Sequence, residues 1–172
     1  MAMSKALTSA ALSRMDADPA TMADAINVEL LKDNTEAMGV TLLLGILDLC
    51  SGEVRMVCAG HEDPILLAGG KAERVRLDGG PPLCAASLAY PLETLVLKPG
   101  EILVLVTDGV TEAQNKRGEL FGGRRLLADG ALKAGHATQI VDSIRDQVRN
   151  FEEGTEATDD LTVMAVRYLG AA

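Results

Sequence analysis

Acidic residues stand at the ends of two strongly apolar segments of this 172-residue chain. Asp108 directly follows the apolar run 102–107, and Asp159 and Asp160 directly precede the apolar run 161–166. A carboxylate at the end of a buried strand emerges at the rim of the core on rigid backbone. If the two strands lie side by side in a sheet, their carboxylates converge at one edge of that sheet.

Converging carboxylates repel each other unless a proton or a cation lies between them. A hard divalent ion with oxygen ligands is the natural solution, and Mg²⁺ and Mn²⁺ are the candidates. Gly109, next to Asp108, would let an ion or a phosphate approach the main chain closely. The alternative is that these aspartates only cap turns, because Asp is a common turn residue. Spacing alone leaves both interpretations open.

Other polar residues have simpler interpretations beside the functional ones. His61 invites a catalytic role, but a lone histidine in a turn is more often structural. Glu112, four residues after Asp108, either supports the site or is a solvated turn carboxylate. The basic pairs 116–117 and 124–125 are candidates for binding phosphate, although basic residues in polar loops are usually just solvated. Two histidines that match no ligand spacing disfavour an unrelated zinc hydrolase.

Residues 1–33 predict two helical stretches, with apolar positions at three- and four-residue steps. Asp18 and Pro19 interrupt and restart the pattern, because proline favours a first helical turn. Residues 40–48 are apolar on both faces, which predicts a central strand, and 54–59 is its expected partner.

Two more hairpins are predicted downstream. Segment 64–68 is expected to pair with 74–77 across a Gly-Gly turn, and 92–97 with 102–107 across a Pro-Gly turn. Helices are expected after the glycines at 122 and 123, the clearer one over 137–150, where Ile140, Val141, Ile144 and Val148 share one face.

A closing strand is predicted over 161–167. Hairpins dominate and no strand–helix–strand alternation is visible, so we expect an α+β fold with mainly antiparallel sheets. A single domain spanning residues 1–172 is the economical prediction.

Composition excludes several classes of protein. The formal net charge of −9 argues against a nucleic-acid surface, and only four aromatic residues leave no base-stacking platform. No run reaches the roughly 18 apolar residues that a membrane span requires, and the first residues do not resemble a secretory signal. We therefore expect a cytoplasmic protein. Three cysteines without a CxxC motif, Cys50, Cys58 and Cys84, are interpreted as reduced and structural.

Five short motifs follow one another along the chain. They are Asp48 with Gly52, then Ala59-Gly60-His61 with Pro64, then Thr107-Asp108-Gly109-Val110-Thr111-Glu112-Ala113, then Glu119-Leu120-Phe121-Gly122 with Arg125-Leu126, and finally Thr158-Asp159-Asp160-Leu161-Thr162. In this order they resemble the motifs of PP2C-type (PPM) serine/threonine phosphatases of the SpoIIE/RsbU class. None is decisive alone, but the ordered set is a strong signal.

The resemblance implies an α-β-β-α sandwich, with two mainly antiparallel sheets flanked by helices. It implies two Mn²⁺ or Mg²⁺ ions that activate a water for in-line attack on phosphorus. By motif, Asp108 and Asp159 would be catalytic metal ligands, and Gly109 would give the backbone room at the metal site. Asp160 and Glu112 would support those ligands. No motif identifies substrate-binding residues.

One family motif has no counterpart in this sequence. The family's first metal segment, G-D-x-x-G-K-G-x-x-A-A, precedes a long helix, and residues 1–7 resemble the interior of that helix. Its bridging aspartate would lie before residue 1. We therefore expect the domain to lack its first strands and first metal-binding motif, and to hold fewer ions or none. A truncated chain and a natural non-catalytic relative both remain open.

The resemblance also implies a substrate class. Relatives often dephosphorylate phosphoserine or phosphothreonine on small anti-anti-sigma (STAS) proteins, and commonly carry an upstream sensor or regulatory domain. The alternative, from another class of function, is a partner-binding module of the same fold with a degenerate metal site.

Overall fold

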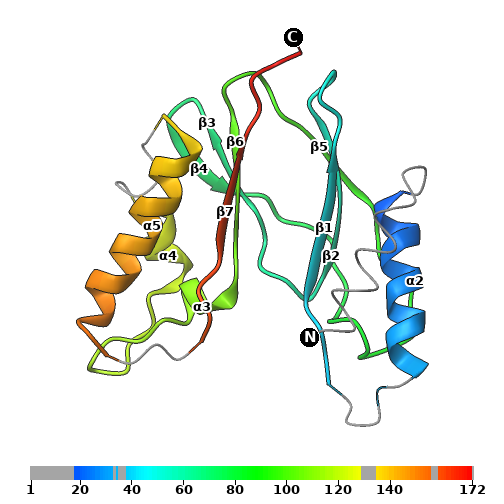
Figure 1. Cartoon of the computed structure of the whole chain (residues 1–172), viewed down its shortest axis with the longest axis horizontal. Coiled ribbons are helices and arrows are strands. Elements are labelled where there is room, and N and C mark those ends of the chain that lie inside the picture. The colour runs from blue at the N-terminus through cyan, green and yellow to red at the C-terminus, as the bar shows by residue number, and fades with distance from the viewer. Residues whose placement is uncertain (1–17, 33, 35–37, 129–134, 156–158, 172) are drawn as a thin grey trace. The chain divides into compact units, whose positions relative to one another are not determined.

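The computed structural model describes residues 18–32, 34, 38–128, 135–155 and 159–171. The chain forms two compact units, the first from residues 1–61 and 77–96 and the second from 62–76 and 97–172. Figure 1 shows the helices and strands of each unit. The first helical stretch predicted from sequence, over residues 1–17, lies outside the described residues. Within the described residues, no helix is long and apolar enough to cross a membrane.

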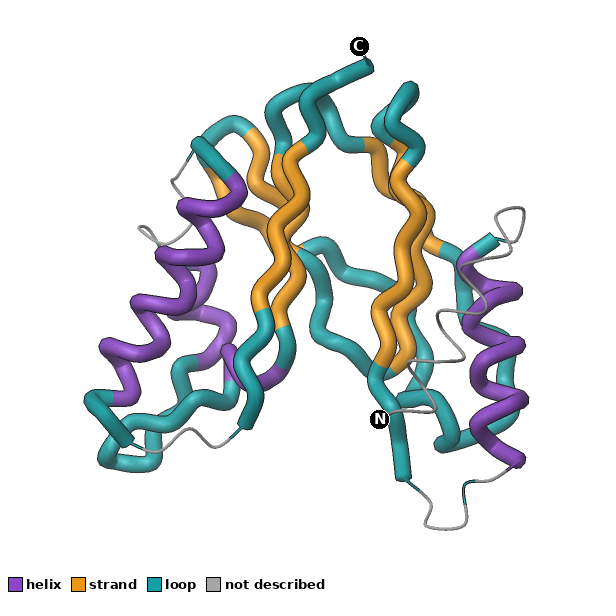
Figure 2. Tube along the Cα trace, viewed as in Figure 1, coloured by secondary structure: helices purple, strands orange, loops and turns teal. Residues whose placement is uncertain are grey.

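In the part of the chain that the structure describes, the first unit is a three-stranded antiparallel sheet with one helix. Its strands β1 (Leu42–Leu47), β2 (Glu53–Ala59) and β5 (Glu93–Val96) lie in the order β1-β2-β5. Helix α2 (Pro19–Lys32) packs against β2 and β1 (Figure 2). It begins where the sequence predicts, because the Asp18 carboxylate accepts hydrogen bonds from the N–H groups of Ala20 and Thr21.

A cluster of hydrophobic side chains fixes the helix to the sheet. Its buried members are Ala23, Ile26, Leu30, Val57, Ala59, Leu83 and Tyr90. One polar side chain joins them: Asn27 is 1% exposed, donates to the Ala86 carbonyl (2.9 Å) and accepts from the Cys84 N–H (2.8 Å). Both hydrogen bonds hold the segment that precedes β5 onto α2, so this buried amide carries no unsatisfied group.

The described residues of the second unit form a four-stranded antiparallel sheet and three helices. Strands β3 (Ile65–Ala68), β4 (Lys71–Arg74), β6 (Ile102–Val106) and β7 (Val163–Arg167) lie in the order β4-β3-β6-β7. The helices are α3 (Asp108–Thr111), α4 (Gly122–Leu127) and α5 (Ala137–Glu152).

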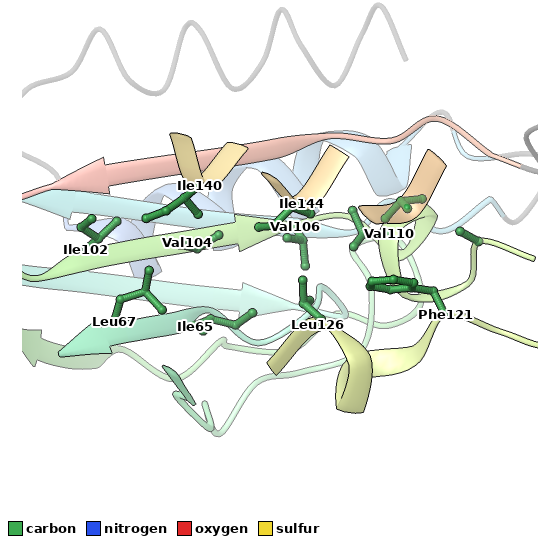
Figure 3. Packing of buried hydrophobic residues seen from close by; sticks show 12 residues of the cluster. Ile65, Leu67, Ile102, Val104, Val106, Val110, Phe121, Leu126, Ile140 and Ile144 are labelled. Carbon is green, nitrogen blue, oxygen red and sulfur yellow. The ribbon is translucent and has the colours of Figure 1, made fainter. Parts of the chain in front are cut away.

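The core of this unit lies between one face of the sheet and α4 and α5. Ile140 and Ile144 of α5 point toward Val104 and Val106 of β6 (Figure 3). Ile140, Ile144 and Val148 are fully buried, so these three residues of the predicted apolar stripe are core packing, whereas Val141 is half-buried. An α+β fold with two antiparallel sheets and helices is thus confirmed.

Three predictions about strand partners need correction. Residues 40–48 were expected to form a central strand, but in the described sheet β2 is central and β1 lies at the side. A segment that is apolar on both faces indicates that both faces of the strand are covered. It does not indicate whether the strand has hydrogen-bonded neighbours on one side or on both. The partner of β3 is 71–74 rather than 74–77, with Ala68 opposite Lys71. The two-residue Gly-Gly loop joins the strands directly and therefore sets this register.

The third correction concerns the predicted hairpin of 92–97 with 102–107. β5 pairs with β2 in the first unit, whereas β6 pairs with β3 and β7 in the second. The turn itself does form, since the Glu101 N–H donates to the Lys98 carbonyl (3.0 Å). A turn between two apolar strands therefore did not decide their pairing here.

Candidate metal centre

β6 and β7 are hydrogen-bonded neighbours, so the condition under which the acidic motifs converge is met. Val106, the last residue of β6, lies opposite Val163, the first residue of β7. Because the strands are antiparallel, the chain leaving β6 and the chain entering β7 meet at the same end of the sheet. Asp108 lies on the outgoing chain, and Asp159 and Asp160 lie on the incoming one.

Thr107 ties the two chains together beyond the end of the ladder. Its N–H donates to the Thr162 carbonyl (3.1 Å), and its hydroxyl oxygen accepts from the Thr162 N–H (3.0 Å). The same hydroxyl donates to the Asp160 carbonyl (3.2 Å). One threonine thus holds the backbone on both sides of the acidic cluster in a fixed register.

Gly109 allows an unusually close approach of the two chains. A Cβ atom at this position would lie 2.5 Å from the Asp160 carbonyl oxygen and 3.0 Å from its carbon, closer than real Cβ atoms come. The φ of Gly109 is not in the left-handed region, so the requirement for glycine is one of space. The space next to Gly109 expected for an ion or a phosphate is therefore taken, on its Cβ side, by the main chain of Asp160.

The carboxylates themselves face outward from this locked backbone. Asp108, Asp159 and Asp160 are exposed. Asp108 Oδ1 accepts from the Gly109 N–H (3.0 Å), and Asp159 Oδ1 accepts from the Asp160 N–H (2.7 Å). Among the described residues, neither second oxygen has a hydrogen-bond partner. Turn formation thus accounts for one oxygen of each carboxylate and leaves the other available to a ligand.

The donor chemistry fits a hard divalent cation, because Mg²⁺ and Mn²⁺ bind carboxylate oxygens. Within the described ranges, however, no group of three or more His, Cys, Asp or Glu residues is placed to hold a metal ion. Among the described residues, Asp108 and Asp159 could therefore supply part of a coordination shell but not a complete one.

Helix α3 carries Asp108 and was not predicted from sequence. It has four residues, and its hydrogen bond from the Glu112 N–H to the Asp108 carbonyl measures 2.7 Å. The Glu112 side chain is exposed. Thr111, 8% exposed, approaches Glu62 Oε1 with its hydroxyl at 3.3 Å, and Glu62 Oε2 forms an ion pair with Arg74 at 3.1 Å.

Sequence reasoning missed Thr107, Glu62 and Arg74 as residues of this region. Thr107 had a signal, since it opens the motif that contains Asp108. Glu62 and Arg74 had none, because only the folded chain brings them to α3.

The motif at 119–126 contributes packing. The Phe121 N–H donates to the Ala113 carbonyl (2.8 Å), and the Phe121 ring meets Phe151 edge-on at 5.5 Å. Arg125 lies over the Phe151 ring at 4.7 Å and donates to the Leu120 carbonyl (2.7 Å). The guanidinium of Arg125 is thus engaged within the fold.

The two motifs of the first unit form turns. The Asp48 carboxylate accepts hydrogen bonds from the N–H groups of Cys50 (2.7 Å) and Ser51 (3.0 Å). The hydrogen bond from Ser51 has the larger effect, and together the two hold the pKa of Asp48 below its ordinary value. Gly60 has φ +66°. His61 is half-buried, and its carbonyl accepts from the Cys58 thiol at 3.3 Å.

Comparison with known proteins agrees with this arrangement. Residues 1–169 match the profile of the family described as Stage II sporulation protein E (SpoIIE). The chain belongs to the SpoIIE family of PP2C-type phosphatases. Protein IcfG of Synechocystis is 31% identical over 132 residues, which are 76% of this chain and 21% of that protein.

Solved structures share the fold at lower identity. The RsbU and RsbW domains of Rv1364c from Mycobacterium tuberculosis superpose with a TM-score of 0.79 and 23% identity, over 99% of this chain and 49% of that one. The phosphatase domain of SpoIIE from Bacillus subtilis, presoaked with manganese, gives 0.63 and 22%, over 95% and 72%. This chain thus spans about a fifth of IcfG and about half of the mycobacterial structure.

Proposed function

We propose that this SpoIIE-family chain is the catalytic domain of a metal-dependent protein serine/threonine phosphatase. The observation that carries the proposal is the packing of Gly109 against the Asp160 carbonyl. This packing joins the Asp108 and Asp159 segments, which the pairing of β6 with β7 brings to one end of two neighbouring strands, with both carboxylates exposed. Each of these carboxylates has an oxygen that is not used by the turn around it.

In this proposal Asp108 and Asp159 hold Mn²⁺ or Mg²⁺. Such ions, when bound, lower the pKa of water and neutralise charge on phosphoryl oxygens. The chain's own part is positioning: Thr107 and Gly109 fix the backbone from which both carboxylates project. The exposed carboxylates of Asp160 and Glu112 flank them and would hold waters or orient the ligands by hydrogen bonds.

The proposed substrate is a phosphoserine or phosphothreonine on a regulatory protein of the anti-anti-sigma (STAS) type, in the cytoplasm. The mycobacterial relative, whose structure contains an RsbU and an RsbW domain, supports a role beside a regulatory domain. The net charge of −9 is consistent with a protein substrate that is recognised away from its phosphate, because an anion meets a repulsive field here unless cations intervene.

The test is hydrolysis of p-nitrophenyl phosphate and of a phosphoserine peptide in the presence of Mn²⁺. Asp108→Asn and Asp159→Asn should each lower the rate by about 100-fold or more, since each removes a ligand charge, and EDTA should abolish it. Asp78→Asn, an exposed aspartate of the first unit, is the matched control and should change the rate less than about twofold. Activity that persists in both site variants, or in EDTA, overturns the proposal.

A partner-binding module with a degenerate metal site is the second candidate. It is favoured by one observation, namely that the described residues contain no three-ligand cluster. Calorimetric titration with Mn²⁺ separates the two functions. Binding at two sites contradicts the degenerate module, whereas undetectable Mn²⁺ binding together with tight binding of a STAS-type phosphoprotein contradicts the enzyme.

A further inference from the structure

We infer that Glu62, acting through Thr111, is a positioning residue for Asp108. The inference rests on the proposed function, because it assigns a residue that holds a proposed metal ligand in place. The sequence motifs identify neither Glu62 nor Thr111 as a metal ligand. The contacts that join them all lie within the second unit.

The first step concerns α3, which cannot hold Asp108 in place unaided. A single four-residue turn is far below the length at which a helix is stable in water. Its core anchor is Val110, which is fully buried. Thr107 and Gly109 hold the beginning of the turn, so a second restraint acts at its end, where Thr111 is buried.

Thr111 supplies that restraint through its hydroxyl. The Thr111 oxygen lies 3.3 Å from Glu62 Oε1 and 3.3 Å from the Asp108 carbonyl oxygen. A hydroxyl carries one proton, and the Asp108 carbonyl already accepts from the Glu112 N–H at 2.7 Å. The charged carboxylate is the stronger acceptor, so the proton goes to Glu62.

Glu62 is in turn fixed by Arg74. Their ion pair measures 3.1 Å, with side chains 26% and 31% exposed, so that solvent screens it only in part. Arg74 is the last residue of β4, opposite Ile65 of β3. The restraint on α3 therefore ends on a paired strand.

Gly123 leaves room for the Arg74 guanidinium. A Cβ at position 123 would lie 2.6 Å from Nη2 of Arg74. The route from β4 through Arg74 and Glu62 to Thr111, a residue of the turn that carries Asp108, is thus continuous.

The experiment compares Thr111→Val, which keeps the shape and removes the hydroxyl, with Thr111→Ser, which keeps the hydroxyl. Glu62→Leu removes the acceptor. Glu73→Gln, at an exposed position of β4, is the control. Without metal, the Glu112 amide should exchange its hydrogen about tenfold faster in Thr111→Val and Glu62→Leu, but not in Thr111→Ser or Glu73→Gln.

A purely structural role would not move the second readout, the Mn²⁺ concentration that half-saturates phosphatase activity. It should rise about tenfold in Thr111→Val and Glu62→Leu, with the KM for p-nitrophenyl phosphate within about twofold of wild type and with rescue in Thr111→Ser. An unchanged Glu112 exchange rate in Thr111→Val overturns the inference. Faster exchange with an unchanged Mn²⁺ requirement overturns it as well. If the wild type hydrolyses nothing, the proposed function fails, and the exchange rates alone still decide whether Glu62 and Thr111 hold this turn.

Discussion

Asp48 in the first unit and Asp108 in the second both follow apolar strands, but their carboxylates are used differently. Asp48 uses its carboxylate to close the turn between β1 and β2, accepting two backbone N–H groups. Among the described residues, the Asp108 carboxylate accepts a hydrogen bond only from the N–H of the next residue, because its backbone is held instead by Thr107 and by the close packing of Gly109. Where the main chain is fixed by other groups, a carboxylate stays free for chemistry.

The largest difference should appear in catalysis. Asp108→Asn should lower Mn²⁺-dependent phosphatase activity by about 100-fold or more, because it removes a ligand charge, whereas Asp48→Asn should change it less than about twofold. Steady-state rates at several Mn²⁺ concentrations measure both. Equal losses in the two variants would remove the distinction between a turn aspartate and a site aspartate.

The second largest effect is expected from disrupting the close packing at Gly109. Gly109→Ala places a Cβ against the Asp160 carbonyl, which is backbone and cannot swing away, so the free energy of unfolding should fall by about 1–3 kcal/mol. Gly135→Ala is the control, because no atom of the described residues, chain neighbours aside, lies within 4 Å of its added Cβ. Urea unfolding followed by circular dichroism gives both values. A stable, active Gly109→Ala protein would contradict the packing described here.

Thr107→Val tests the hydroxyl that joins the two acidic segments. The change leaves the Thr162 N–H without its acceptor and the Asp160 carbonyl without a donor, and should cost about 1–2 kcal/mol. Thr94→Val on exposed β5 makes the same chemical change where no such hydrogen bonds exist among the described residues, and should stay within about 0.5 kcal/mol. Similar unfolding midpoints for the two variants would show that Thr107 locks nothing.

The smallest effect is the pH dependence of the Asp48 turn. The pKa of Asp48 is lowered in the folded chain, so its charged form favours folding above the unfolded pKa, and this contribution is lost as the pH falls through the lower folded pKa. Asp48→Asn should therefore unfold at a lower urea concentration than wild type at about pH 6, with the gap narrowing below about pH 4. A gap that is independent of pH would show that the charge of Asp48 contributes nothing; Asp78→Asn controls for the loss of one negative charge.

Sequence reasoning predicted the parts of the fold that depend on local pattern. Helix α5 follows from its apolar spacing, α2 from the restart at Asp18 and Pro19, and the β1–β2 hairpin from its turn chemistry. The adjacency of β6 and β7 was only a condition for the acidic motifs to converge, and the fold meets that condition. The pairing of β5 was predicted wrongly, since the turn after it is real but the strands that it joins belong to different sheets.

The sequence by itself determined the family, through the order of its motifs, and the residue types that could bind a cation. Only the tertiary structure decided which atoms those residues leave available. The oxygens of Asp48 and Asp108 are chemically identical, and their use depends on which backbone N–H groups lie within reach. The same holds for Glu62, which is separated from Thr111 by 49 positions along the chain and meets it only because β3 pairs with β6. Contacts between distant segments are set by strand pairing and packing, and local sequence carries no record of them.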